Sequence, residues 1–263
     1  MLKNRRNCFD SIRNFYERIY YIKIKCSNND GIHINSSRHV TVSNCNITCG
    51  DDCIIIRANN VSLKENKVCE HVTVTNFNLT SYSGAIRIGW VQDGVIRNCT
   101  LSNLVITDSS IGVSIYIPSS QRTAPNPQSI ACADVGREAT LIENISFSNV
   151  IMDKQCSFPI YINITDNENV MFNKIRNIYF SQIHSRGPEF PYIKGRTNNF
   201  AENIHFTNCS FDITDGSEFI SRPTHGWTGI NDFIPNRPMT IMNAKNISFN
   251  NTTFSNLKEE NRL

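Results

Sequence analysis

The sequence lacks a long run of apolar residues. It contains no stretch of about 18 or more of them, so a membrane-spanning helix is not expected. The opening residues, MLKNRRNCFDSIRNF, also lack the apolar core of a signal peptide. Hydrophobic residues still make up 40% of the 263 positions, which is enough for a large core in one or two ordinary domains.

The sequence also lacks a strong charge of either sign. Charged residues are 19% of the chain and the net charge is +3, which is too small to favour nucleic acid or a membrane as a partner. The ten cysteines contain no paired CxxC motifs. Cys45, Cys49 and Cys53 follow one another at intervals of four, which is not the spacing of a zinc finger, so no structural zinc is expected.

Helical patterns are scarce, and only residues 5–16 suit a short helix. What the sequence does contain is an internal repeat, in which apolar residues alternate along a strand before a turn and a second short strand. The clearest copies are RHVTVSNCNIT (38–48), EHVTVTNFNLT (70–80), IENISFSNVIMD (142–153), IRNIYFSQIHS (175–185), AENIHFTNCSFD (201–212) and AKNISFNNTTFS (244–255).

An amide residue follows the first strand in each copy. Asn tolerates the left-handed backbone conformation and bonds neighbouring backbone groups, so stacked copies predict a ladder of amide side chains along the molecule. The predicted ladder comprises Asn44, Asn76, Asn103, Asn149, Gln182, Asn208 and Asn251.

A third short strand lies between these copies. It reads DGIHI (30–34), DCIII (52–56), GAIRI (84–88), IGVSI (111–115) and FPIYI (158–162). About three short strands in each repeat predict an all-β parallel solenoid, whereas a propeller would need antiparallel four-stranded blades. We expect a single domain over 1–263, with irregular or short helical structure at 1–17, solenoid rungs at 18–257 and a tail at 258–263.

Three carboxylates stand out in an otherwise neutral segment. Asp30 and Asp52 occupy the same slot of consecutive rungs, with Asp51 beside them, and rungs stack roughly 4.8 Å apart. The three should form one cluster in which at least one pKa is raised. Such a cluster can supply the acid and the base of glycoside hydrolysis. Solvated acids on an exposed turn and a calcium site are the alternatives.

These residues resemble a known family. The NND at 28–30 and the GDD at 50–52, set in an Asn-rich β-repeat, are similar to the NTD and GDD motifs of glycoside hydrolase family 28, the polygalacturonase family. The resemblance runs from about residue 18 to the C-terminus and implies a right-handed single-stranded parallel β-helix. It also implies that Asp51 is the general acid, that Asp30 and Asp52 activate water with inversion, and that Asn28 orients the site.

Two further motifs of that family are absent. The GHG motif corresponds to YSGAIRIG at 82–89, which contains no His, and the RIK motif corresponds to Ser114, Ile115 and Tyr116. The family's acids are therefore present, whereas its His and the basic pair that holds the galacturonate carboxylate are not. The chemistry of hydrolysis remains the expectation, and polygalacturonate as the substrate is put in doubt.

The alternation of the strands identifies further candidate substrate-binding residues. His33, Arg87 and Ser114 share an outward slot on successive rungs and should line the same groove as the acids. Arg87 would bind a substrate carboxylate or hold one Asp ionised, and the alternative is a solvated surface Arg. Trp90 and Tyr116 are candidate platforms for sugar rings, with ordinary packing as the alternative.

The sequence therefore predicts a glycosidase that hydrolyses pectin-like or related plant polysaccharide without a metal or other cofactor. Its partner would be a polysaccharide or oligosaccharide, in an extracellular or cell-wall location by the resemblance. A non-catalytic β-helix that binds polysaccharide is one alternative. A β-helix lyase, which would need Ca²⁺ and a strong base, is another.

The length of chain before the first motif is short for this family. Relatives place several rungs before NTD, and here 27 residues precede Asn28. The expectation is that N-terminal rungs are missing and that an exposed solenoid edge gives weak stability or self-association.

Overall fold

The computed structural model of the protein describes residues 20–23, 29–59, 63, 67–90, 93–118, 140–155, 157–165, 174–214 and 238–256. The expectations for 1–17, 258–263 and the Asn28 side chain fall outside these ranges. Within them, no helix is both long and apolar enough to cross a bilayer.

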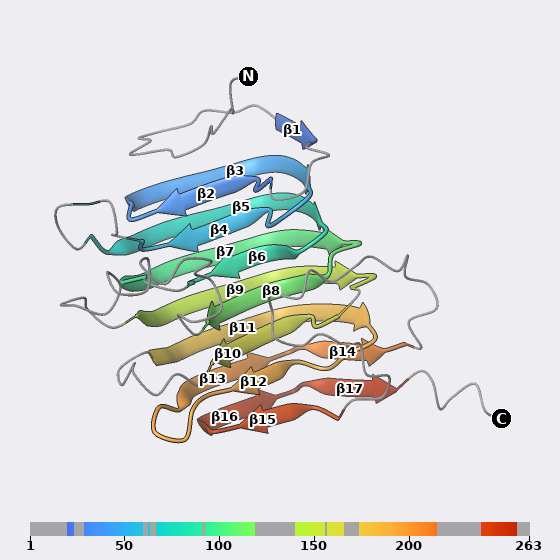
Figure 1. Cartoon of the computed structure of the whole chain (residues 1–263). Helices are drawn as coiled ribbons and strands as arrows, with labels where there is room; N and C mark the ends of the chain where they lie inside the picture. Colours follow the sequence, from blue (N-terminus) through green and yellow to red (C-terminus); the bar gives the residue numbers. More distant parts are fainter. Residues whose placement is uncertain are drawn as a thin grey trace, which may run out of the picture.

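The described residues form two parallel β-sheets (Figure 1). Along the first sheet the strands are β1(Tyr20–Lys23), β3(Arg38–Cys49), β5(Cys69–Ser81), β7(Val95–Thr107), β9(Leu141–Asp153), β11(Lys174–Gly187), β13(Ala201–Thr207) and β16(Ala244–Asn250), with β14(Ser210–Ile213) and β17(Thr253–Asn256) beside them. Along the second they are β2(Ile32–Asn35), β4(Ile54–Arg57), β6(Gly84–Ile88), β8(Ile111–Ile117), β10(Ile160–Ile164), β12(Tyr192–Lys194) and β15(Thr240–Met242).

The chain alternates between the two sheets, so each turn adds one strand to each. This is the predicted right-handed parallel β-helix, and the fold class is confirmed. The first two strands of each repeat are joined into one long bent strand in β3, β5, β7, β9 and β11. In the last described rungs they separate, as β13 with β14 and β16 with β17.

The bend in each long strand coincides with the predicted amide ladder. All seven of its residues have positive φ, from 47° at Asn251 to 62° at Asn76. The side-chain amide of Asn76 donates to Asn44 at 3.0 Å, and that of Asn149 donates to Asn103 at 2.8 Å. The chain therefore bends at residues, mostly Asn, that adopt the left-handed conformation and form side-chain hydrogen bonds with their equivalents one rung away.

A second ladder, which the sequence patterns above did not predict, bends the same strands nearer their N-terminal ends. The side chain of Asn144 donates to Asn98 at 3.1 Å, and Asn177 donates to Asn144 at 3.0 Å. Its other positions include a stacked pair of His rings, 4.8 Å apart between centroids. All seven of its residues have positive φ: His39, His71, Asn98, Asn144, Asn177, Asn203 and Asn246.

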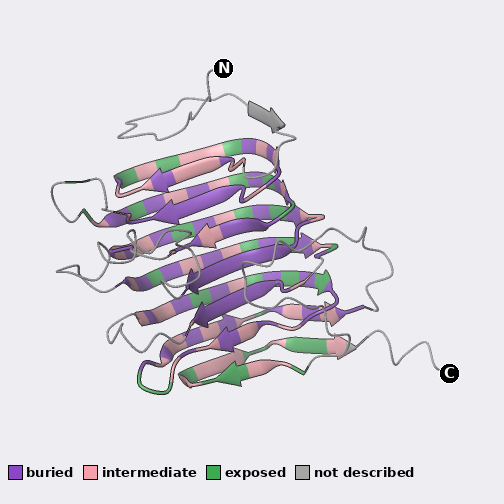
Figure 2. Cartoon of the chain, in the orientation of Figure 1, coloured by how far each residue is buried: buried purple, intermediate pink, exposed green. Residues whose placement is uncertain are grey.

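The space between the sheets is filled by apolar side chains, mostly Ile, Val, Leu, Phe and Cys. Phenyl rings stack nearly parallel from rung to rung, with centroids 4.8–5.0 Å apart along Phe147, Phe180, Phe206 and Phe249. The residues that point between the sheets are buried along most of the molecule, whereas none of the residues with a described burial in β15, β16 and β17 is buried (Figure 2). The core therefore holds both sheets in register and fixes what their outer faces present.

Candidate active site

The three carboxylates meet where the chain enters β2 and β4. The N–H of Gly31 donates to the Asp52 carbonyl at 2.8 Å, and the N–H of Asp51 donates to the Asn29 carbonyl at 3.2 Å. One carboxylate oxygen from each of Asp30, Asp51 and Asp52 lies within 4.8 Å of the other two. The register of adjacent rungs therefore produces the cluster that the repeat predicts.

Asp52 is the fully buried member of the cluster. One of its oxygens accepts a hydrogen bond from the N–H of Gly84 at 2.9 Å, and the other lies 2.9 Å from the Nη1 atom of Arg87. A Cβ atom at residue 84 would meet the first oxygen at 2.9 Å, so glycine gives the carboxylate room. Burial raises the pKa of Asp52, and the Arg87 guanidinium opposes that rise.

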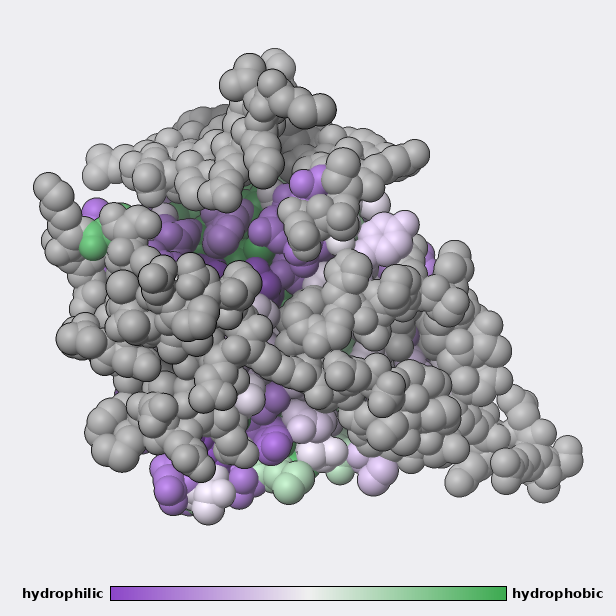
Figure 3. Space-filling model, viewed as in Figure 1, coloured by the Kyte–Doolittle hydropathy of each residue, from purple (hydrophilic) through white to green (hydrophobic). Residues whose placement is uncertain are grey.

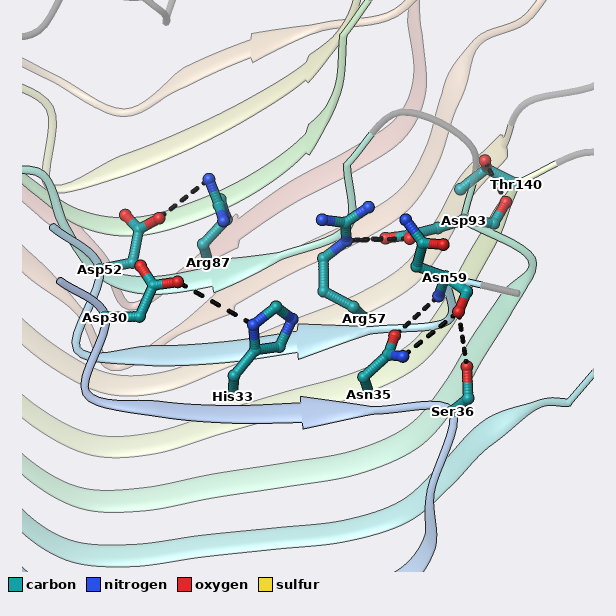
Figure 4. Close-up of polar contacts among 10 residues, drawn as sticks. All are labelled: Asp30, His33, Asn35, Ser36, Asp52, Arg57, Asn59, Arg87, Asp93 and Thr140. Atoms are coloured by element: carbon teal, nitrogen blue, oxygen red, sulfur yellow. Dashed lines mark hydrogen bonds and ion pairs between the residues drawn. The ribbon is translucent and has the colours of Figure 1, made fainter. Parts of the chain in front are cut away.

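Asp30 and His33 face each other at the more accessible side of the cluster (Figure 4). The His33 Nδ1 atom lies 3.9 Å from an Asp30 oxygen. Partial burial, followed by the charge of Asp52, raises the pKa of Asp30 to about 6. Partial burial, followed by the charges of Arg57 and Arg87, lowers the pKa of His33 to about 4, so this His is neutral over most of the pH range.

A second buried ion pair lies beside His33 and was missed from the sequence. The Nε atom of Arg57 donates to both carboxylate oxygens of Asp93, at 2.9 and 2.8 Å. The Thr140 hydroxyl donates to the Asp93 carbonyl, and the backbone of Asp93 forms an isolated antiparallel β-bridge with that of Asn59. The alternation in DCIIIR predicts that Arg57 lies on the outward face of β4, so its position could have been predicted from the sequence. Its pairing with Asp93 could not, because Asp93 comes from a connecting segment.

The remaining predicted residues lie along the same outward face. Ser114 pairs in register with Arg87 on the neighbouring strand, and Trp90 lies under the Arg87 guanidinium at 4.6 Å from the ring centroid. Tyr116 packs edge-on against both Trp90 and Tyr161, with centroid distances of 5.6 Å. Ser114 and Tyr116 are buried, and Trp90 is partly exposed. In this structure Trp90 offers an aromatic surface, whereas Tyr116 supports it from behind.

The site is hydrophilic and combines acids that lie in different environments. A hydrophilic patch lies over β2 and β4 (Figure 3). Its acids differ in environment, since Asp52 is buried against Arg87 while Asp30 and Asp51 are partly exposed. Arg87 already supplies positive charge at Asp52, which disfavours a metal cation among these oxygens. The arrangement suits proton transfer between carboxyl groups and a bound molecule.

Comparison with known proteins identifies the family. The model of "Glycosyl hydrolases family 28" matches residues 12–221. The chain belongs to glycosyl hydrolase family 28. The match includes the three acids and Arg87, so the site described above lies within the family's domain.

Relatives agree with this assignment. The chain is 29% identical over 161 residues to an exopolygalacturonase of Platanus acerifolia, covering 57% of this chain and 37% of that protein. Two solved structures share the fold at 17% identity. A family 28 exopolygalacturonase of Yersinia enterocolitica has a TM-score of 0.61 over 87% of this chain and 36% of its own, and a hyperthermoactive exopolygalacturonase of Thermotoga maritima has 0.59 over 74% and 41%. The chain thus spans less than half the length of these proteins.

Proposed function

We propose that this chain is a glycosidase that hydrolyses glycosidic bonds in pectin-like or related plant polysaccharide. Membership of family 28 supports the reaction class, and the exopolygalacturonase relatives support the substrate class. The observation that carries the proposal is the meeting of three carboxylates, one oxygen of each within 4.8 Å of the others, where the chain enters β2 and β4.

Each acid has a proposed part in an inverting reaction, a stereochemistry that rests on the family resemblance and not on the spacing of the acids. Asp51 donates a proton to the glycosidic oxygen as the bond from that oxygen to the anomeric carbon breaks. A water molecule attacks the same carbon from the opposite face and gives its proton to the Asp30 and Asp52 pair. Asp30 is the partly exposed member and reaches the water, while Asp52 holds its negative charge against Arg87.

The neighbouring residues position these groups. Arg87 is proposed as the counterion that keeps Asp52 ionised, which is one of the two uses predicted from its slot. His33, neutral above about pH 4, offers a hydrogen bond to a sugar hydroxyl without adding charge. Trp90 offers a partly exposed ring for a sugar face, and Asn28 is proposed to orient the site by the family resemblance.

The test is release of reducing ends from a panel of pectic and rhamnogalacturonan substrates. Wild type is compared with Asp51→Asn and with Asp153→Asn, an acid on β9 away from the cluster. We expect release by wild type and Asp153→Asn and a loss of at least about a hundredfold in Asp51→Asn, since general acid catalysis contributes about 10²–10⁴. Proton NMR of the first product then reports whether the anomeric configuration is inverted.

Two other outcomes would replace the proposal. Oligosaccharide binding with no release by any variant would indicate a non-catalytic β-helix. An unsaturated, ultraviolet-absorbing product that disappears on chelation would indicate a lyase, because lyases of this shape depend on Ca²⁺ and leave a double bond.

A further inference from the structure

We propose that the sugar unit held over His33, between Arg57 and Arg87, is uncharged, as in a neutral or carboxyl-esterified sugar, and not a free uronate. The inference rests on the proposed function and specifies the substrate of that same site. It concerns the outward face of β2, β4 and β6, where these side chains lie together (Figure 4).

The first cation of this face is already committed to an internal partner. The Arg87 Nη1 atom lies 2.9 Å from an oxygen of Asp52, and the side-chain exposures of the two residues are 12% and 0%. The same guanidinium lies over the Trp90 ring, which holds it in place from a second side. A substrate carboxylate that took this cation would leave the Asp52 charge buried without compensation.

The second cation, Arg57, is also paired with a buried carboxylate of the protein. Arg57 donates through Nε to both oxygens of Asp93, and the exposures of their side chains are 9% and 0%. The Thr140 hydroxyl and the bridge to Asn59 fix the backbone of Asp93. Arg57 is therefore held inside the wall as a structural counterion, and a ligand anion would have to compete with a buried carboxylate for it.

The local charge balance adds to this argument. The described acids of the site are Asp30, Asp51, Asp52 and Asp93, and they face two arginines. His33 does not add to the positive side near neutral pH, because its pKa is lowered to about 4. A free uronate brings one more negative charge to a face whose two arginines already lie against the carboxylates of Asp52 and Asp93, whereas an ester or a neutral sugar does not.

The next strand does not restore a cation among the described residues. The slots after Arg87 and Gly89 on β8 hold Ser114 and Tyr116, which are neutral and buried. The next described cation along this face is Lys194 on β12, three strands beyond β6 and so about 14 Å away. That separation is more than the length of one sugar unit, so Lys194 cannot serve the unit held over His33.

A matched ligand pair tests the proposal. Fully methyl-esterified oligogalacturonate and the free acid of the same length are titrated by calorimetry into the full chain carrying Asp51→Asn, at pH 6.5 and in moderate salt. We expect the ester to bind about tenfold or more tightly than the acid, because each free carboxylate held near the site is repelled by its acids. Equal affinities, tighter binding of the acid, or no binding of the ester would each overturn the proposal.

Turnover separates this inference from the proposed function. If the ester is preferred in binding and wild type releases no reducing ends from either ligand, the hydrolytic function fails and the specificity stands. If wild type cleaves the free acid at a higher kcat/KM than the ester, the function stands and the specificity is overturned.

A variant of the second ion pair tests the cause. Asp93→Asn, combined with Asp51→Asn, keeps the shape of residue 93 and removes the charge that holds Arg57. We expect the preference for the ester to fall at least about tenfold, because Arg57 becomes available to a ligand carboxylate. An unchanged preference in a folded variant would overturn the role of Arg57, and the ligand comparison in Asp51→Asn alone decides the matter if the double variant fails to fold.

Discussion

The guanidinium of Arg87 on β6 and the carboxylate of Asp52, two residues before β4 begins, form a buried ion pair 2.9 Å long. Asp52 completes its coordination with the N–H of Gly84, so both of its oxygens are engaged by β6. The pair thus joins the turn that carries Asp51 and Asp52 to the next rung of the helix. The ion pair links two rungs of the fold, and under the proposed mechanism it also keeps Asp52 ionised.

Replacing Arg87 by Met should destabilise the protein. Removing one partner of a buried ion pair leaves an uncompensated charge and costs about 3–5 kcal/mol in the free energy of unfolding. The measurement is urea unfolding at pH 7. Arg87→Lys, which keeps the charge, should lose less. The double variant Arg87→Met with Asp52→Asn should recover most of the loss, and failure to recover would show that packing on Trp90, and not charge, dominates.

Much of this site could be predicted from the sequence because the repeat carries the register. The period of two in each short strand identifies His33, Arg87 and Ser114 as outward-facing, and the offset between repeats places Asp30 over Asp52. These relations depend only on counting residues along stacked strands. The positive φ of the predicted amide ladder follows from the same repetition.

The rest depends on contacts that alternation does not encode. The partner of Arg57 comes from the segment before β7, and no spacing rule relates residue 57 to residue 93. Tyr116 faces outward by alternation and is nevertheless buried between Trp90 and Tyr161. Side-chain packing on the outer face of a sheet depends on which segments cover it, and a strand pattern gives only the direction of each side chain.

The pH dependence of activity should have an acid limb set by Asp30. Its pKa is raised to about 6, and under the proposed mechanism it must be ionised to accept a proton from water. Activity should therefore fall as the pH drops below about 6. The Arg87 charge lowers the pKa of Asp30, so Arg87→Met should move the limb in kcat/KM to higher pH.

The control for this pH profile is Arg186→Met, which removes a cation on β11 and should leave the limb unchanged. A limb that stays in place when Arg87 is replaced, or one that moves equally in both variants, would contradict the assignment to Asp30. Profiles from about pH 4 to 8 on one soluble oligosaccharide are sufficient.

His33 should make the folded state sensitive to acid. Its pKa is about 4 when folded and about 6.5 when unfolded, so the unfolded chain binds more protons in this interval and stability falls as the pH drops from 6.5 to 4. His33→Asn should remove a loss on the order of 2 kcal/mol between pH 7 and 4.5. His184→Asn, at a His with an exposed hydrogen bond to Ser210, is the control. Equal acid losses in wild type and His33→Asn, by urea unfolding, would refute the effect.

The amide ladder should depend on backbone conformation as well as on hydrogen bonds. Asn103 has a φ of 55°, donates to Asn76 at 3.2 Å and accepts from Asn149 at 2.8 Å. Asn103→Ala should lower the free energy of unfolding by about 1–3 kcal/mol, from strain and lost bonds together. Asn103→Gly loses the same bonds without the strain and should be the more stable of the two variants, as measured by urea unfolding.

The opposite order is expected at Thr100, three residues before Asn103, and it gives this prediction its control. Thr100 lies on the same strand, is exposed, and is not among the residues with positive φ. There Thr100→Ala should be more stable than Thr100→Gly, because glycine adds only the entropy of the unfolded chain. If Ala were the better residue at both positions, the hydrogen bonds alone would account for the ladder. If Gly were better only at residue 103, the left-handed conformation would be the reason that Asn recurs in nearly every rung.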